Sequence, residues 1–167
     1  MSNNRVNDDF VDDGPQYLTE EGARALREEL DELVNVKRPE LATKLKDAIA
    51  MGDLSENADY HDAKEQQAFL EGRITYLENV LRNAKIIDED GGRRDVVRLG
   101  SEVTIQEEGE EPETYRLVGP AEANPSEGRI SNESPLGRML LGKKARAKVK
   151  VPTPDGGQIV FKILKIG

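Results

Sequence analysis

A regular spacing of mostly apolar residues between positions 60 and 84 is the strongest structural pattern in this sequence. The residues recur three and four positions apart, at Tyr60, Ala63, Gln67, Leu70, Ile74, Leu77, Leu81 and Ala84. Because it is sustained for more than three heptads, this spacing predicts a long helix with a narrow coiled-coil seam. The seam is narrow and its flanks are heavily charged, which disfavours a globular helical bundle.

The residues before Gly52 predict a second helix that pairs with the first. Thr19 followed by Glu20 and Glu21 is typical of a helix start, because a hydroxyl caps the first turn and acids favour its positive end. The apolar spacing runs through Leu26, Leu30, Leu33, Leu41, Leu45 and Ala48. Pro39 predicts a kink inside this helix. Two helices joined around residues 52–57 form an antiparallel hairpin, a finger roughly 45 Å long.

Beyond the hairpin, the apolar period changes from that of a helix to that of a strand. Alternation at Val103 and Ile105, at 114–118, from Ala145 to Val151 and at 159–163 predicts strands. In this interpretation Arg146, Lys148 and Lys150 share one solvated strand face. Residues 134–142 predict a short helix, with Pro in its first turn and Gly at its end.

These patterns together predict an α+β fold in four segments. They are a disordered acidic tail (1–14), an antiparallel coiled-coil helical hairpin (15–89), a linker (90–97) and a small antiparallel β-sheet domain with one short helix (98–167). The chain has 167 residues and a net charge of −9, and the segment 15–89 alone carries ten basic and seventeen acidic residues. Independent binding to duplex DNA needs a cationic surface, so this charge favours a protein partner.

Composition excludes several kinds of site and location. The chain has no cysteine, which rules out disulfides and thiolate metal sites. No apolar run reaches the length of a signal peptide or a membrane span. We therefore expect a soluble, cytoplasmic protein.

Acidic residues gather where the finger turns, at Asp53, Glu56 and Asp59. Asp53 and Glu56 suit two of the oxygen ligands of Mg²⁺, and a second macromolecule would have to complete such a site. The alternative is a capping box, in which Asp53 caps the second helix and Glu56 reaches back. Spacing alone favours the capping box. His61, the single histidine, is expected to form a surface hydrogen bond and not a metal bond.

The tip is part of a longer string that resembles a known family. Gly52-Asp53-Leu54-Ser55-Glu56-Asn57-Ala58-Asp59-Tyr60 and Glu71-Gly72-Arg73-Ile74 resemble the tip and second helix of GreA/GreB transcript-cleavage factors, GreA above all. Tyr115-Arg116-Leu117-Val118-Gly119 and the region 130–142 also resemble that family. The resemblance covers residue 17 to the end, and it favours the Mg²⁺ interpretation of Asp53 and Glu56 over the capping box.

The resemblance implies a monomeric transcription elongation factor that is an accessory protein and not an enzyme. Its partner would be bacterial RNA polymerase, and its target the backtracked RNA 3′ end in an arrested elongation complex. The hairpin would enter the polymerase through the secondary channel. A second domain similar to FK506-binding proteins (FKBP-like) would bind the rim of that channel.

The resemblance also implies roles for particular residues. Asp53 and Glu56 would help the polymerase hold a second Mg²⁺ and the attacking water, and the chain would bind no cofactor by itself. Ser134, Pro135 and Leu136 match the family's polymerase-binding loop, although a simple helix start with Leu136 buried remains an alternative. The candidates for guiding extruded RNA are Lys44, Lys46, Lys64 and Arg73.

Three other functions can be weighed against this one. A prolyl isomerase needs a pocket lined by aromatic residues, and residues 90–167 offer only Tyr115 and Phe161. A coiled-coil spacer or chaperone has no need of Asp53 and Glu56. A homologue that occupies the channel and inhibits polymerase stays open, although the intact tip string favours cleavage. The apolar segment 48–51 departs from the family, whose members often carry charged residues there.

Overall fold

The computed structural model describes residues 14–52, 56–88 and 95–167. They form two compact units, which we call the hairpin unit (Arg27–Asn83) and the sheet unit (Gln16–Leu26 with Ala84–Gly167). The tail predicted at 1–14 lies, apart from Gly14, outside the described residues. The domain boundaries inferred from the sequence stay predictions. Within the described ranges, no helix is long and apolar enough to cross a membrane.

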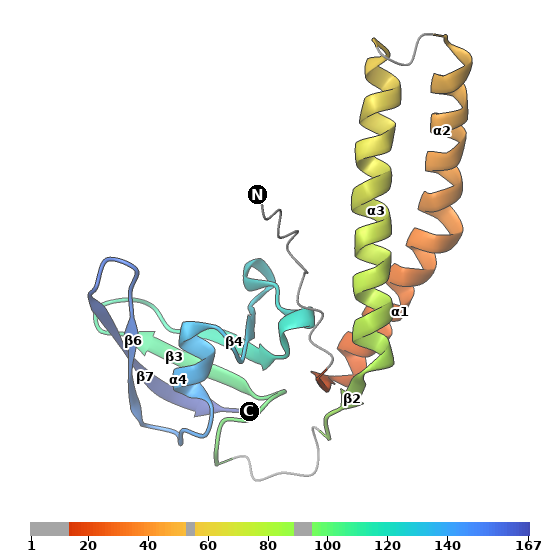
Figure 1. The fold of residues 1–167 in the computed structure, drawn as a ribbon. Coiled ribbons are helices and arrows are strands. Elements are labelled where there is room, and N and C mark those ends of the chain that lie inside the picture. The colour runs from red at the N-terminus through yellow and green to blue at the C-terminus, as the bar shows by residue number, and fades with distance from the viewer. Residues whose placement is uncertain (1–13, 53–55, 89–94) are drawn as a thin grey trace, which may run out of the picture. The chain divides into compact units, whose positions relative to one another are not determined.

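The hairpin unit confirms the predicted pair of antiparallel helices. Its first arm passes from α1 (Glu20–Glu32), which begins in the sheet unit, through η1 (Leu33–Lys37) into α2 (Arg38–Ala50). Its second arm is α3 (Ala58–Arg82), and α2 and α3 run side by side in opposite directions (Figure 1). At about 1.5 Å per residue, the 25 residues of α3 extend over about 37 Å.

The predicted seam is the buried face of the hairpin. On α3, Ala63, Ile74 and Leu77 are at most 2% exposed, and on α2, Leu41 and Ala48 are at most 8% exposed. Burial of such aliphatic side chains is the main favourable contribution to the pairing of two helices.

Two salt bridges join the arms beside the seam. The Arg38 guanidinium contacts both carboxylate oxygens of Glu71 at 2.8 Å. Arg73 contacts both oxygens of Glu29, at 2.7 and 2.9 Å. Bidentate pairs of this kind fix orientation as well as adding energy.

The first arm does not end at Pro39, and its irregularity lies one turn earlier than the proline. Leu33–Lys37 form a π-helical segment, and Pro39 then sits in the first turn of α2. Because η1 runs directly into α2, the missing N–H of Pro39 removes one helical hydrogen bond, as expected from the sequence. The wider π turn accommodates the proline without breaking the helical path.

A five-stranded sheet forms the centre of the sheet unit. Its strand order is β5-β4-β3-β7-β6. The strands are β3 (Glu102–Glu107), β4 (Glu113–Val118), β5 (Arg129–Ser131), β6 (Lys148–Pro152) and β7 (Gln158–Ile166). The pairs β3–β4, β3–β7 and β6–β7 are antiparallel, as predicted. The pair β4–β5 is parallel, and the sequence pattern did not predict β5.

One face of this sheet is covered by α4 (Pro135–Leu140), the short helix that was predicted (Figure 1). Leu140 is fully buried in a core with Ile105, Leu117 and Ile163. Val97, placed by the sequence in the linker, belongs to this core and is 1% exposed.

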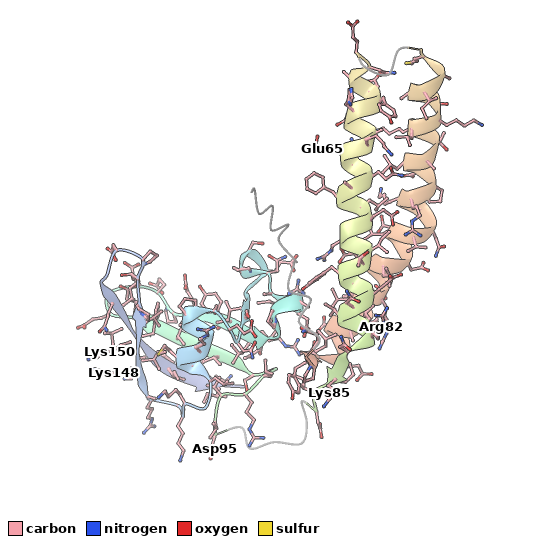
Figure 2. The ribbon with its side chains drawn as sticks, in the orientation of Figure 1. Glu65, Arg82, Lys85, Asp95, Lys148 and Lys150 are labelled. Carbon is pink, nitrogen blue, oxygen red and sulfur yellow. The ribbon has the colours of Figure 1, made fainter. Side chains whose placement is uncertain are left out.

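The strand predicted from Ala145 begins later, at Lys148. Arg146 has a left-handed φ of 71°, so the chain turns there before β6 begins. Arg146 therefore does not share the strand face of Lys148 and Lys150, which are both exposed and project from β6 (Figure 2).

The start of α1 is built into the sheet unit by a buried carboxylate. The short strands β1 (Gln16–Leu18) and β2 (Ala84–Ile86) pair in parallel, and Thr19 follows β1. Glu122, in the 3-10 turn η2 (Pro120–Glu122), accepts hydrogen bonds from the Thr19 backbone N–H at 2.9 Å and from its hydroxyl. Thr19 Oγ1 in turn accepts from the Gly22 N–H at 2.9 Å. The predicted Thr19 cap is thus present, supported from a residue 103 positions away.

Candidate functional site

Asn57 organises the tip of the hairpin. It is the N-cap of α3, and its Oδ1 accepts a hydrogen bond from the Tyr60 N–H at 3.1 Å. Its Nδ2 donates to the carbonyl oxygen of Ala48 at 2.7 Å. One amide side chain therefore satisfies a free N–H at the start of α3 and binds a carbonyl near the end of α2.

The capping-box interpretation of the tip is wrong, because the residue that caps α3 is Asn57 and not Asp53. Glu56 lies before the start of α3. Its carboxylate is exposed and forms no hydrogen bond or ion pair with any described residue. Asp53 lies outside the described residues, and its role stays a prediction.

Apolar side chains stand exposed beside this acidic tip. Ile49 is 49% exposed and Met51 is 73% exposed, directly before the turn at Gly52. Gly52 has a left-handed φ of 113°, a conformation that glycine adopts without steric cost. Of the apolar segment 48–51, Ile49, Ala50 and Met51 thus face solvent, whereas Ala48 is buried in the seam.

The four cations expected to guide RNA have different surroundings. Lys44 and Lys64 are exposed, and among the described residues each donates a hydrogen bond to a glutamine oxygen, Lys44 to Gln66 at 3.4 Å and Lys64 to Gln67 at 3.1 Å. Lys46 is exposed as well. Arg73 is held in the bidentate pair with Glu29, which neutralises its charge and favours a structural role for it.

Of the candidate polymerase-binding residues at the start of α4, two contribute to the fold and one lies on the surface. Ser134 is the N-cap: its Oγ accepts from the Gly137 N–H at 3.0 Å and donates to the Ser131 carbonyl at 2.7 Å. Leu136 packs against the sheet core, as the helix-start alternative expects. Pro135 is exposed, and of the three it is the residue best placed to contact a partner.

Sequence patterns missed two residues that shape these regions. Asn57 carries a usable signal, since asparagine directly before a helical run is a preferred N-cap. Glu122 carries no local signal, because its partner Thr19 is distant in the chain. In the described part of the chain, no group of three or more His, Cys, Asp or Glu could hold a metal ion.

Comparison with known proteins shows the family of this chain. The family models "Transcription elongation factor, N-terminal" and "Transcription elongation factor, GreA/GreB, C-term" match residues 16–86 and 92–167. The chain belongs to the GreA/GreB family of transcription elongation factors.

Individual relatives cover nearly the whole chain. Transcription elongation factor GreA of Bacillus licheniformis is 54% identical over 151 residues, which cover 89% of this chain and 94% of the relative. GreA of a Roseiflexus species is 51% identical over 147 residues, covering 87% and 94%. The solved structure of GreA factor homolog 1 from Thermus thermophilus is 29% identical, with a TM-score of 0.43 over 92% of this chain and 99% of that one.

Proposed function

We propose that this chain binds bacterial RNA polymerase and stimulates the polymerase to cleave backtracked RNA, which rescues arrested complexes. The observation that carries the proposal is the free, exposed carboxylate of Glu56 at the end of the hairpin. Because Asn57 caps α3, this carboxylate has no part in holding the helix together. In this proposal the chain is an accessory factor, and the bond is cut in the active site of the polymerase.

The proposed chemistry of the tip follows from what carboxylates offer to a phosphoryl reaction. A second Mg²⁺ in the polymerase would activate the attacking water and stabilise the charge that develops on the phosphate. Mg²⁺ in such sites is held by one or two carboxylates together with waters and phosphates. The exposed carboxylate of Glu56 fits that ligand type, and Asp53 is the proposed second donor. Both would be supplied to a site that the polymerase completes.

The proposed docking contact lies in the sheet unit. Pro135 is an exposed, rigid residue at the start of α4, held in place by the hydrogen bonds of Ser134 on one side and by the packing of Leu136 on the other. A preformed surface of this kind loses little conformational freedom on binding. The hairpin would then enter the secondary channel with its acidic tip leading.

Stalled elongation complexes with labelled RNA test this proposal. Addition of the chain with Mg²⁺ is expected to shorten the transcripts and to restore elongation, and the chain without polymerase is expected to leave the RNA intact. Occupation of the channel without cleavage would instead slow the polymerase and leave transcript length unchanged. That result would overturn the proposal in favour of an inhibitory homologue.

A further inference from the structure

The outer face of α3 carries exposed aromatic residues that the hairpin itself does not use. Phe69 is 73% exposed and Tyr76 is 43% exposed. Together with Glu65 and Gly72 they are spaced four, three and four residues apart, which places them along one side of a helix. We call these four residues the α3 stripe. Figure 2 shows Glu65 on the side of α3 that faces away from α2.

Gly72 has no role inside the hairpin that would explain it. A Cβ built at this position meets no atom within 4 Å. Glycine in the middle of a helix is less favourable than alanine, because it loses more backbone freedom. A mid-helix glycine in open space, with an aromatic ring one turn to each side, is suited to a surface that another molecule approaches closely.

The α3 stripe is held ready for such a contact. The Arg73 guanidinium lies 5.4 Å from the centre of the Tyr76 ring, over its face, and the same group is fixed by Glu29. Tyr76 is therefore restrained in the unbound protein. A restrained aromatic side chain loses less conformational entropy on binding.

Charge decides which class of molecule can cover the stripe. Arg73, the cation that lies over the Tyr76 ring, is paired with both carboxylate oxygens of Glu29. Glu65 is exposed and has no hydrogen bond or ion pair with a described residue. A nucleic acid needs free cations for its phosphates, so this face disfavours RNA and DNA. It suits a protein that offers an apolar side chain and a basic group.

We propose that the α3 stripe is a docking surface for the polymerase protein, separate from both the acidic tip and Pro135. An apolar side chain of the polymerase would rest on Gly72 between Phe69 and Tyr76, and a basic group would meet Glu65. This inference rests on the proposed function, since a hairpin that enters a channel must present its sides to the channel wall.

Substitutions on the stripe test the proposal against matched changes elsewhere on the hairpin. Phe69→Ala and Gly72→Met are expected to weaken binding to core RNA polymerase by about tenfold each, the loss expected when a central contact is removed or blocked. Val36→Ala removes another exposed apolar side chain, and Ala42→Met adds the same bulk at another exposed helical site. Both controls are expected to bind as the wild type does.

Gly72→Ala separates docking from stability. Alanine favours the helix, so the melting temperature is expected to rise. Binding to polymerase is nevertheless expected to fall severalfold, because the methyl group occupies the position of the partner. Binding that is unchanged or improved in both Gly72→Ala and Gly72→Met would overturn the inference.

Photo-crosslinking identifies what covers the stripe. With p-benzoyl-phenylalanine at position 69, crosslinks to a polymerase subunit are expected in the elongation complex, and the same group at position 36 is the control. Crosslinks mainly to RNA, or to a second copy of this chain, would overturn the proposed partner.

If the wild-type chain does not bind polymerase at all, the proposed function fails. If it binds and the stripe variants bind equally well, only this inference fails.

Discussion

Asn57 and Ala48 form a hydrogen bond that closes the hairpin at its tip, with Asn57 Nδ2 donating to the Ala48 carbonyl at 2.7 Å. The same side chain caps α3 through the Tyr60 N–H. The residues on either side of the turn are therefore tied to each other independently of the carboxylates at the tip. That separation allows the stability of the hairpin and the chemistry of its end to be tested apart.

Asn57→Ala is expected to lower the free energy of unfolding by roughly 1–2 kcal/mol, because it removes an N-cap and a hydrogen bond to a backbone carbonyl. Asn57→Asp keeps the oxygen that accepts from Tyr60 N–H and loses the donor to Ala48. Its free energy of unfolding is therefore expected to lie between those of the wild type and Asn57→Ala. Urea unfolding followed by circular dichroism measures both. Equal stability of the alanine variant and the wild type would contradict the role assigned to Asn57.

A second prediction concerns the buried pair of Thr19 and Glu122. Glu122→Ala leaves the N–H and hydroxyl of Thr19 without their acceptor, at an expected cost of about 1–3 kcal/mol. Gly22→Ala should also destabilise the protein, although alanine normally favours a helix, because its methyl group would overlap the Glu122 carboxylate.

A double-mutant cycle tests that overlap directly. In the Glu122→Ala background, Gly22→Ala is expected to lower the free energy of unfolding much less than it does alone, or to raise it. Additive effects in urea unfolding would show that Gly22 and Glu122 do not interact in this way.

The salt bridge between Arg38 and Glu71 predicts a dependence of hairpin stability on pH. The hydrogen bond from Arg38 holds the pKa of the Glu71 carboxyl below its ordinary value of 4.5. Because the pKa is depressed in the folded state, the contribution to stability is present above pH 4.5 and is lost as the pH falls through the folded-state pKa. Both side chains are nearly half exposed, so the effect is small and screened by salt.

Glu71→Gln checks the sign of that dependence. At neutral pH and low salt, the variant is expected to melt below the wild type. The difference should shrink in high salt and disappear under acid conditions, where the wild-type carboxyl is protonated. A melting difference that grows on acidification would contradict the assignment.

Docking through α4 gives a fourth prediction. Pro135→Arg places a long charged side chain on an exposed position and is expected to weaken polymerase binding at least about tenfold, as loss of a central contact does. Pro152→Arg makes the same change at another exposed proline of the sheet unit and is the control. Both proteins should keep the circular dichroism spectrum of the wild type. Normal binding by a folded Pro135→Arg protein would place the interface elsewhere.

Periodicity was sufficient to predict the hairpin, because the seam of α3 repeats over its whole length and one face of it is buried. The alternation of Val149 and Val151 with lysines likewise predicted β6. The same alternation wrongly placed Arg146 in that strand, because a turn with a positive φ leaves no trace in the apolar pattern. The π segment before Pro39 also depends on local backbone geometry that the pattern does not encode.

Long-range contacts account for most of what the sequence did not predict. Strand β1 pairs with β2, which lies after the whole hairpin, and Glu122 supports a helix start 103 residues away. At the tip, spacing alone favoured a capping box, and the structure assigns the cap to Asn57. The clustering of acids pointed to Glu56, but only the resemblance to a family favoured the Mg²⁺ interpretation of it, which stays a prediction.

The tip carboxylates are proposed to act on the RNA cleavage reaction and not on docking. Asp53→Asn and Glu56→Gln keep size and polarity but remove the charge that a second Mg²⁺ requires. Asp47→Asn removes one exposed negative charge from α2 and is the matched control.

The decisive measurement is the rate of transcript cleavage in stalled complexes saturated with each variant, alongside its affinity for polymerase. Both tip variants are expected to bind as the wild type does, with cleavage about 10²-fold slower, as when one electrostatic contact to a transition state is lost. Raising Mg²⁺ should recover part of the rate, and Asp47→Asn should cleave normally. Wild-type cleavage rates in both Asp53→Asn and Glu56→Gln would contradict the claim.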